Sequence, residues 1–465
     1  MRDFEACFGV ERWASTEFGG AGLGDPRRTK RLLLLGALAA QNPSGKLTEV
    51  CAQSAEDLQG SYRFLSNPHF STDAICSSVL KATANRCLGA EFVYMPVDGS
   101  SLAITDWKDV RGLGIIGTRK KDARGLKVMT GIALLPDGCP MGLASQKFWI
   151  RPIKKRKKAV AQKRRLEEKE TKYWIDVIKE SRAGFSNAGV EAKLWYQLDR
   201  EGDFWHLMLQ VQAHNDWFTV RSHKDRCVRE GGHLTTVLAG APIAGCFELH
   251  VPGARGRKER VAWMELRHAK VTLDMKDPWT SERYSIDVTV VSASEIGAPQ
   301  GEEPLYWRLL TNRPVNDAME AWQVVFGYSL RWRVEDFHKA WKSGACNAED
   351  TQLGSAGAII RWSTILASVA MRIERLKHLA RNSPNEPASI ELTPKEIEAV
   401  IVLRKPKGIP RDYKPTIAEV VLWIAEMGGY TGKRSGGPPG TVVIGRGLEK
   451  VEIVVEALRN LLEKL

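Results

Sequence analysis

Short apolar runs that end in an acid constrain the fold of this sequence more than any other feature. Phe92–Val97 is followed by Asp98, and Lys193–Leu198 is followed by Asp199. Apolar runs of this length indicate strands, and helical stretches separate them along the chain. Strands that alternate with helices form a mixed α/β sheet whose functional sites lie at the strand ends. We therefore expect a mixed α/β sheet with a site close to these two acids.

Regions of different character surround this sheet. Residues 1–75 are expected to form short helices, with Asp25 as the N-cap of a helix that begins at Pro26. Residues 225–313 contain β-branched and apolar runs with Gly and Pro between them, which predicts a mainly β insertion. Residues 373–465 are expected to form small helices separated by loops rich in Gly and Pro.

Composition excludes several classes of protein. Apolar residues make up 43% of the chain, which rules out a disordered protein. No apolar window reaches the length of about 18 residues that a membrane span needs. Residues 1–13 carry acids where a signal peptide has its apolar core, so we expect a cytoplasmic protein. The eight cysteines include no Cys-x-x-Cys pair, and they predict neither a zinc site nor a disulfide framework.

An excess of positive charge predicts a polyanionic partner. The 465 residues include 68 Lys+Arg and 55 Asp+Glu, a net charge of +13, and nucleic acid is the commonest partner of such proteins. Arg27, Arg28 and Lys30 follow a predicted helix start, where they either grip phosphates or form a solvated face. The basic stretch Arg151–Arg165 is either an added nonspecific DNA contact or the exposed start of a helix that continues to about Ser181.

A helical segment around residue 335 carries one acid among polar and basic side chains. We expect one helix from about residue 314 past residue 342, with five residues on one face because they are spaced by 3, 4, 4 and 3. A face with one acid among polar and basic side chains is unusual both for a buried core and for a solvated surface. The pattern is explained if the acid ligates a metal ion and the residues beside it hold phosphate oxygens. The five residues are Tyr328, Arg331, Glu335, Lys339 and Lys342.

Asp98, Asp199 and Glu335 are the candidate metal ligands. Carboxylates from distant segments that meet at a sheet edge can hold two divalent cations, which activate a water on one side of a phosphate and stabilise the leaving oxygen on the other. Oxygen ligands favour Mg²⁺, for which Mn²⁺ substitutes. Taken alone, each acid is more simply a helix cap or a surface charge.

The spacing Tyr328-x2-Arg331-x3-Glu335-x6-Lys342 resembles the Tyr-Arg-Glu-Lys signature of bacterial DDE transposases of the insertion-sequence-four family, and of Tn5-type members in particular. The resemblance extends over roughly residues 10–375 and is weak beyond them. Other matching motifs are Leu23–Arg28, Ser61–Phe64, Val97–Leu102, Asp199–Asp203, Val220–Ser222 and Trp307–Thr311.

The resemblance implies an RNase H-like catalytic core over residues 76–372, which the β insertion interrupts. It implies that Asp98, Asp199 and Glu335 form a metal-binding triad. Trp307 would stack on a base flipped out of the transposon end, although strand alternation leaves a core role open. The implied DNA contacts are Tyr328, Arg331, Lys339, Lys342 and Arg221.

The sequence therefore predicts a cut-and-paste DNA transposase. Its expected partners are double-stranded DNA with transposon-end inverted repeats, target DNA and, in the paired-end complex, a second copy of the chain. The final helix, Leu448–Leu465, carries an apolar stripe that packs on its own domain or on a partner subunit, and it is the candidate dimer contact. Two alternatives remain: an RNase H-like nuclease without strand transfer, and an inactive DNA-binding derivative of a transposase.

Overall fold

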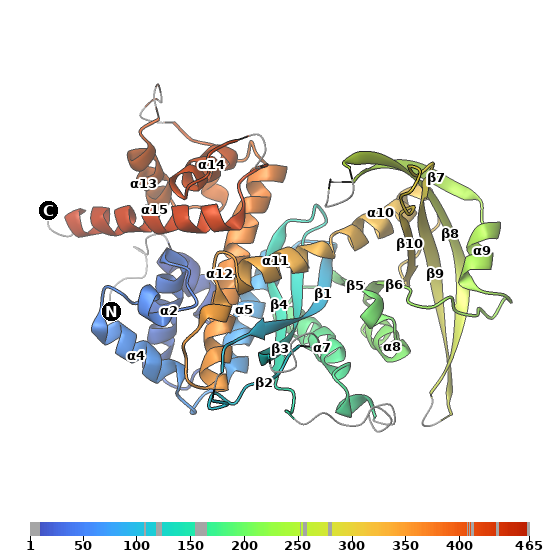
Figure 1. Ribbon diagram of the computed structural model, residues 1–465, viewed down its shortest axis with the longest axis horizontal. Coiled ribbons are helices and arrows are strands. Elements are labelled where there is room, and N and C mark those ends of the chain that lie inside the picture. The colour runs from blue at the N-terminus through green and yellow to red at the C-terminus, as the bar shows by residue number, and fades with distance from the viewer. Residues whose placement is uncertain are drawn as a thin grey trace.

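A 10-stranded mixed sheet forms the centre of the computed structural model (Figure 1). The structure describes residues 10–106, 108–117, 123–153, 165–251, 253, 258–277, 281–406, 408, 410, 413–433 and 437–462. The N-terminal and C-terminal helices lie side by side at one end of the molecule, and the longest strands lie at the other end. The predicted mixed α/β class, with helical regions on the N- and C-terminal sides, is confirmed.

The strands follow the order β2-β3-β1-β5-β6-β10-β9-β8-β7, and β4 pairs with β3. The neighbours β1, β5 and β6 run parallel, whereas β3 and β10 are antiparallel to the strands beside them. The strands are β1 (Phe92–Ala103), β2 (Gly114–Ile115), β3 (Arg124–Leu134), β4 (Pro140–Trp149), β5 (Lys193–Leu198), β6 (Trp217–Arg221), β7 (Ile243–Val251), β8 (Arg260–Lys276), β9 (Arg283–Ile296) and β10 (Tyr306–Thr311).

Both acid-terminated strands are present. β5 has the predicted bounds, and β1 begins at Phe92 but continues past Asp98. The extension forms because Gly99–Ala103 pairs with β3 as far as Gly125. Asp98 therefore lies within a strand, whereas Asp199 directly follows one.

The insertion at residues 225–313 does not form a sheet of its own. β10 pairs antiparallel with β6, with Leu309 opposite Arg221, and β9, β8 and β7 follow it outward. The predicted mainly β insertion is thus present, and its strands extend the central sheet. It also contains one helix, α9 (Leu234–Gly240), which packs on β8 and β9. Sequence alone gave no signal for this pairing between strands far apart in the chain.

The N-terminal region is helical, as predicted. The Asp25 carboxylate accepts a hydrogen bond from the Arg27 backbone N–H at 2.9 Å, and Pro26 is the first helical residue, so the predicted cap is confirmed. This arrangement satisfies a backbone donor that a helix start otherwise leaves unpaired. The helices are α1 (Val10–Phe18), α2 (Pro26–Gln41), α3 (Leu47–Val50), α4 (Ala55–Leu65) and α5 (Thr72–Arg86).

The helix expected to continue to about Ser181 is described from Lys172 on. α7 spans Lys172–Asn187, and a short 3₁₀ turn at Leu166–Glu168 precedes it. Residues 154–164, most of the basic stretch, lie outside the described residues. Within the described part, Arg151 forms an ion pair with Glu170. The next helix, α8 (Trp205–Ala213), follows the loop after β5.

The single helix predicted from residue 314 past residue 342 is wrong. The chain forms α10 (Ala318–Ser329) and α11 (Trp332–Lys342) instead. α10 packs tightly on β1, because a Cβ at Gly327 would lie only 2.4 Å from the ring of Tyr94. Leu330 ends α10 and Arg331 precedes α11, so the break falls inside the predicted stripe.

The long helix α12 (Ala356–Asn382) connects the sheet to the C-terminal region. Its length and hydropathy would suffice for a membrane span, but 78% of its most apolar window is buried inside this fold, as in a core helix. The C-terminal helices α13 (Pro394–Arg404), α14 (Ile417–Met427) and α15 (Thr441–Leu462) follow it.

The apolar stripe of the final helix faces its own domain. Leu448, Val451 and Val455 of α15 are buried, and α15 packs on α12, α13 and α14. This part of the stripe packs on its own domain, whereas Val454 and Leu458 are only half-buried. The side chains of the stripe beyond Leu458 lie outside the described residues, so the candidate dimer contact stays a prediction. Among the described side chains of α15, the large apolar ones that are exposed are Val442 and Ile453.

Candidate active site

The parallel pairing of β1 and β5 brings two of the predicted acids to one edge of the sheet. Pro96 lies opposite Gln197 in this register, so Asp98 and Asp199, each two residues further along, lie side by side. Helix α11 packs on β1 and carries Glu335 in its first turn. Three distant segments of the chain thus place Asp98, Asp199 and Glu335 near one another.

Negatively charged side chains surround Asp98. Its side chain is 18% exposed, and burial raises the pKa of this carboxyl to about 7, with a further contribution from the Asp199 carboxylate. The guanidinium of Arg331 opposes the shift, and the charge of Glu335 adds to it. A perturbed carboxyl beside two more carboxylates is typical of functional sites.

Arg331 lies between two of these acids. Its Nη1 is 3.6 Å from Asp98 Oδ2, and its Nη2 donates a hydrogen bond of 2.8 Å to Glu335 Oε1. The guanidinium is 8% exposed and stacks 4.8 Å from the ring centroid of Trp332. In this arrangement the described residues contain no group of three His, Cys, Asp or Glu side chains close enough to hold a metal ion. Arg331 supplies the local positive charge.

Asp199 is held by the loop that follows β5. Its carboxylate accepts a hydrogen bond of 2.7 Å from the Glu201 backbone N–H and caps a 3₁₀ turn at Arg200–Gly202. A Cβ at Gly202 would approach Leu198 Cβ to 2.9 Å, so the chain turns closely against the strand it has just left.

The five-residue stripe is only partly a single surface. Tyr328 lies in the last turn of α10 and is buried. The other four residues, Arg331, Glu335, Lys339 and Lys342, belong to α11 or its cap. Lys342 Nζ lies 3.4 Å from Ser100 Oγ on β1 and faces the site. Lys339 is exposed. Burial raises the pKa of the Tyr328 phenol, which stays neutral near Arg331.

Trp307 borders the site through Tyr328. The two rings are 6.1 Å apart and meet edge to face, and Trp307 is half-buried on β10. Arg221, at the end of β6, donates a hydrogen bond of 3.2 Å to the Tyr306 carbonyl oxygen, and its charge also acts on Tyr328. These side chains form a continuous border from the insertion to Arg331.

The basic residues of α2 lie elsewhere, at the end of the molecule that holds the N-terminal helices (Figure 1). Arg27 is paired with Asp25 yet 91% exposed, and Lys30 is exposed. Arg28 instead donates a hydrogen bond of 2.8 Å to the Leu23 carbonyl oxygen and contributes to the local fold. Arg27 and Lys30 remain the available cations of this group.

Two features near the carboxylates were missed from the sequence. Trp332, three residues before Glu335 on the same helix, is 56% exposed. Asp203 is fully buried in an ion pair with Arg226. Its position in the Asp199–Asp203 motif was the available signal, because a second acid so close to the first needs a partner of its own.

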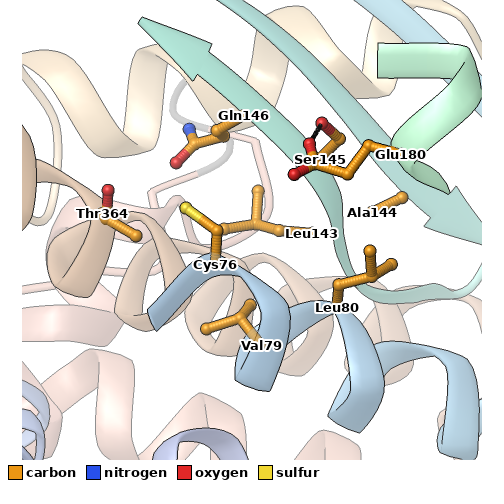
Figure 2. A pocket seen from close by; sticks show the side chains of 9 residues that line it. All are labelled: Cys76, Val79, Leu80, Leu143, Ala144, Ser145, Gln146, Glu180 and Thr364. Carbon is orange, nitrogen blue, oxygen red and sulfur yellow. Dashed lines mark hydrogen bonds between the residues drawn. The ribbon is translucent and has the colours of Figure 1, made fainter. Parts of the chain in front are cut away.

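The pocket drawn in Figure 2 is not the candidate site. It lies among α5, β4, α7 and α12, and its walls include Cys76, Leu143 and Thr364. Ser145 donates a hydrogen bond to Glu180 there, as the dashed line shows. Its free space admits about one water molecule, so it is a packing defect rather than a ligand site.

Comparison with known families gives two matches. Residues 10–70 match the model described as transposase DNA-binding, and they include α1 to α4. Residues 368–462 match the model described as the transposase Tn5 dimerisation domain, and they include most of α12 and all of α13 to α15. The chain is thus a DNA transposase, a DNA-processing enzyme. Its C-terminal domain makes it similar to the Tn5 transposase, with DNA and a second copy of the chain as its partners.

Proposed function

We propose that this transposase acts by cut and paste with Asp98, Asp199 and Glu335 as its catalytic carboxylates. We also place it among the DDE enzymes of the insertion-sequence-four family, on the Tyr-Arg-Glu-Lys spacing that ends at Lys342. The observation that supports the proposal best is the arrangement around Arg331. Three acids from three distant segments meet at one sheet edge, with one guanidinium between two of them.

The donor chemistry of these side chains fits Mg²⁺, for which Mn²⁺ would substitute. All three offer hard oxygen ligands. Burial, with a further contribution from the Asp199 and Glu335 carboxylates, raises the pKa of Asp98, and added positive charge would offset both effects. Asp98, Asp199 and Glu335 would hold the ion. When bound, such a cation activates a water or hydroxyl for attack at phosphorus and stabilises the leaving oxygen.

The cations of α11 are suited to hold the DNA backbone at this edge. A phosphate that reaches the site competes with Asp98 and Glu335 for the Arg331 guanidinium, which can bind two oxygens at once. Burial of Arg331 strengthens that interaction, because little water screens it. Lys342 adds a second donor beside Ser100. Together they would fix the scissile phosphate relative to the carboxylates.

The border formed by Trp307, Tyr328 and Arg221 would hold the distorted end of the transposon. An aromatic ring beside the site can stack on a base that leaves the duplex, and Arg221 can bind the phosphate next to it. Exposed Trp332 offers a second stacking surface. Hydrolysis alone needs no such surface, so this border favours strand transfer over simple nuclease activity.

The expected reaction proceeds by successive in-line displacements at phosphorus. Water attacks one strand at each transposon end and releases a 3′ hydroxyl. That hydroxyl attacks the opposite strand to form a hairpin, and a second water opens it. The freed 3′ ends then attack target DNA. Each step exchanges one P–O bond for another and removes one proton from the attacking oxygen.

The test uses labelled DNA that carries the inverted repeats flanking the gene. Wild-type protein should give nicked, hairpin and strand-transfer products in Mg²⁺. Asp98→Asn, Asp199→Asn and Glu335→Gln should give none, yet should still shift the DNA in a gel, since residues 10–70 bind it. Nicks without hairpins would identify a nuclease. Wild-type cleavage by any of these variants would remove that residue from the site.

A further inference from the structure

A buried ion pair joins the loop after β5 to the turn after β6. The Asp203 side chain is fully buried, and its Oδ1 accepts a hydrogen bond of 2.6 Å from Arg226 Nη2. Its Oδ2 accepts one of 2.7 Å from the His223 backbone N–H, and Arg226 also donates to the Asp203 carbonyl oxygen at 3.0 Å. Both carboxylate oxygens and the backbone of Asp203 are thus engaged by one short segment.

The two segments that this pair joins serve different parts of the proposed site. The first begins at Asp199, a proposed metal ligand. The second begins at Arg221, a proposed DNA contact, and it is fixed to β10 because the Ser222 N–H donates to the Arg308 carbonyl oxygen at 2.9 Å. β10 carries Trp307. The pairing of Leu198 with Val220 sets the spacing of the strands themselves, and the ion pair fixes the two loops beyond their ends relative to each other.

A second buried ion pair, Asp216 with Arg182, lies at the opposite edge of the sheet, away from the proposed catalytic carboxylates. Asp216 precedes β6 and is 1% exposed; its Oδ1 accepts hydrogen bonds from Arg182 at 3.2 Å and from the Leu194 N–H at 3.0 Å. Both pairs combine a buried aspartate, an arginine and a backbone donor. Buried ion pairs add little net stability over apolar packing, so their geometry is the more informative property.

We propose that Asp203, acting through Arg226, is a positioning residue for hairpin formation. It touches neither DNA nor metal itself. It holds the loop that begins at Asp199 against the turn that begins at Arg221, so that the carboxylate and the side chains of the border keep a fixed relative orientation. This inference rests on the proposed function, because only a reaction that needs both the carboxylates and the base-stacking border makes the spacing critical.

The first nick and the hairpin step should depend on this spacing to different degrees. Nicking requires the carboxylates and one phosphate. Hairpin formation also requires the insertion to hold the flipped base and bent strand while the 3′ hydroxyl attacks. Displacing reacting groups by about 1 Å can slow such a step by about 100-fold. Loss of the ion pair should therefore leave nicked DNA to accumulate.

The experiment follows nicked and hairpin products over time for wild type, Asp203→Ala, Asp203→Asn and the control Asp216→Ala, with melting temperatures alongside. Asp203→Ala should lower the hairpin-to-nick ratio by roughly 10- to 100-fold. Asp203→Asn should recover much of the ratio, because its amide oxygen can still accept the His223 N–H. Asp216→Ala should lower the melting temperature yet leave the ratio within about twofold of wild type.

Fluorescence of 2-aminopurine at the flipped position, measured in Ca²⁺ without cleavage, gives a second readout. It should be reduced in Asp203→Ala and normal in Asp216→Ala. Equal ratios and equal fluorescence in the two alanine variants would overturn the positioning role and leave a merely structural pair. A wild-type protein that nicks but never forms hairpins would instead refute the proposed function, and the positioning role with it.

Discussion

Two buried aspartates, Asp216 and Asp98, lie at opposite edges of the central sheet and have opposite surroundings. At the amino-terminal edge, Asp216 is bound by Arg182 and by a backbone N–H. At the carboxyl-terminal edge, Asp98 has two further carboxylates beside it and shares one guanidinium with Glu335. Burial raises the pKa of both aspartates. The neighbours, rather than the burial, distinguish the two edges.

The difference distinguishes an ion pair that stabilises the fold from a cluster of carboxylates that serves function. A buried acid with its own arginine and backbone donor contributes a local link between strands. A buried acid beside other acids is costly in the free protein, and that cost falls when a cation arrives. We therefore expect substitutions at the two edges to have opposite effects on activity and stability.

The largest expected effect is the loss of DNA cleavage at the carboxyl-terminal edge. Glu335→Gln should slow nicking by about 1,000-fold or more, which corresponds to about 4 kcal/mol, because it weakens the metal site. Asp216→Asn should change nicking by less than about threefold, since it lies at the far edge. Initial rates on labelled end DNA measure both. Comparable losses in the two variants would remove the distinction between the edges.

Stability should show the reverse order. Asp216→Ala leaves Arg182 buried without its carboxylate and should lower the free energy of unfolding by about 3 kcal/mol. Urea unfolding at pH 8 measures this loss, with the exposed Asp336→Ala as the control that should change little. An unaffected Asp216→Ala protein would show that this ion pair does not hold the strands.

Asp98→Asn should stabilise the metal-free protein at pH 8. The pKa of Asp98 in the folded state, about 7, lies above its unfolded value of 3.8, so ionisation opposes folding. That penalty is absent below the unfolded pKa, grows as the pH rises, and is complete above pH 7. Removing it should add up to about 4 kcal/mol at pH 8 and less than about 1 kcal/mol at pH 4. Unfolding in EDTA at both pH values tests the sign; destabilisation at pH 8 would contradict it.

Trp307→Ala should have the smallest effect on the reaction, and it tests whether the carboxyl-terminal edge includes a base-stacking surface. If the ring stacks on a flipped base, its loss should slow hairpin formation about tenfold, or about 1.4 kcal/mol, with little change in nicking. A purely core tryptophan should instead lower the melting temperature and depress every step together. Product time courses with melting curves distinguish these outcomes.

Local sequence patterns predicted the elements of the fold well. β5 has the predicted bounds and α2 begins at the predicted Pro26, because apolar runs with clear boundaries and good caps specify strands and helices locally. Asp98 and Asp199 followed from the same logic, since parallel strands bring their ends together. What failed depended on contacts between distant segments.

Three features lay beyond local patterns. The break between α10 and α11 falls at Leu330 and Arg331, and no Gly or Pro marks it in the sequence from Tyr328 to Lys342. The place of the insertion at the side of the central sheet depends on the pairing of β10 with β6, a contact between segments far apart in sequence. The apolar stripe of α15 was open to its own domain or a partner subunit, and its Leu448, Val451 and Val455 pack on its own domain.

The central claim is that Asp98, Asp199 and Glu335 together hold a divalent cation, and iron-directed cleavage of the polypeptide tests it most directly. Fe²⁺ can replace Mg²⁺ in such sites, and with ascorbate and peroxide it produces hydroxyl radicals that cut nearby backbone. In the complex with end DNA, we predict cuts beside residues 98, 199 and 335 that disappear in excess Mg²⁺ and in Glu335→Gln. Cuts at other positions, or cuts that persist in Glu335→Gln, would contradict the account.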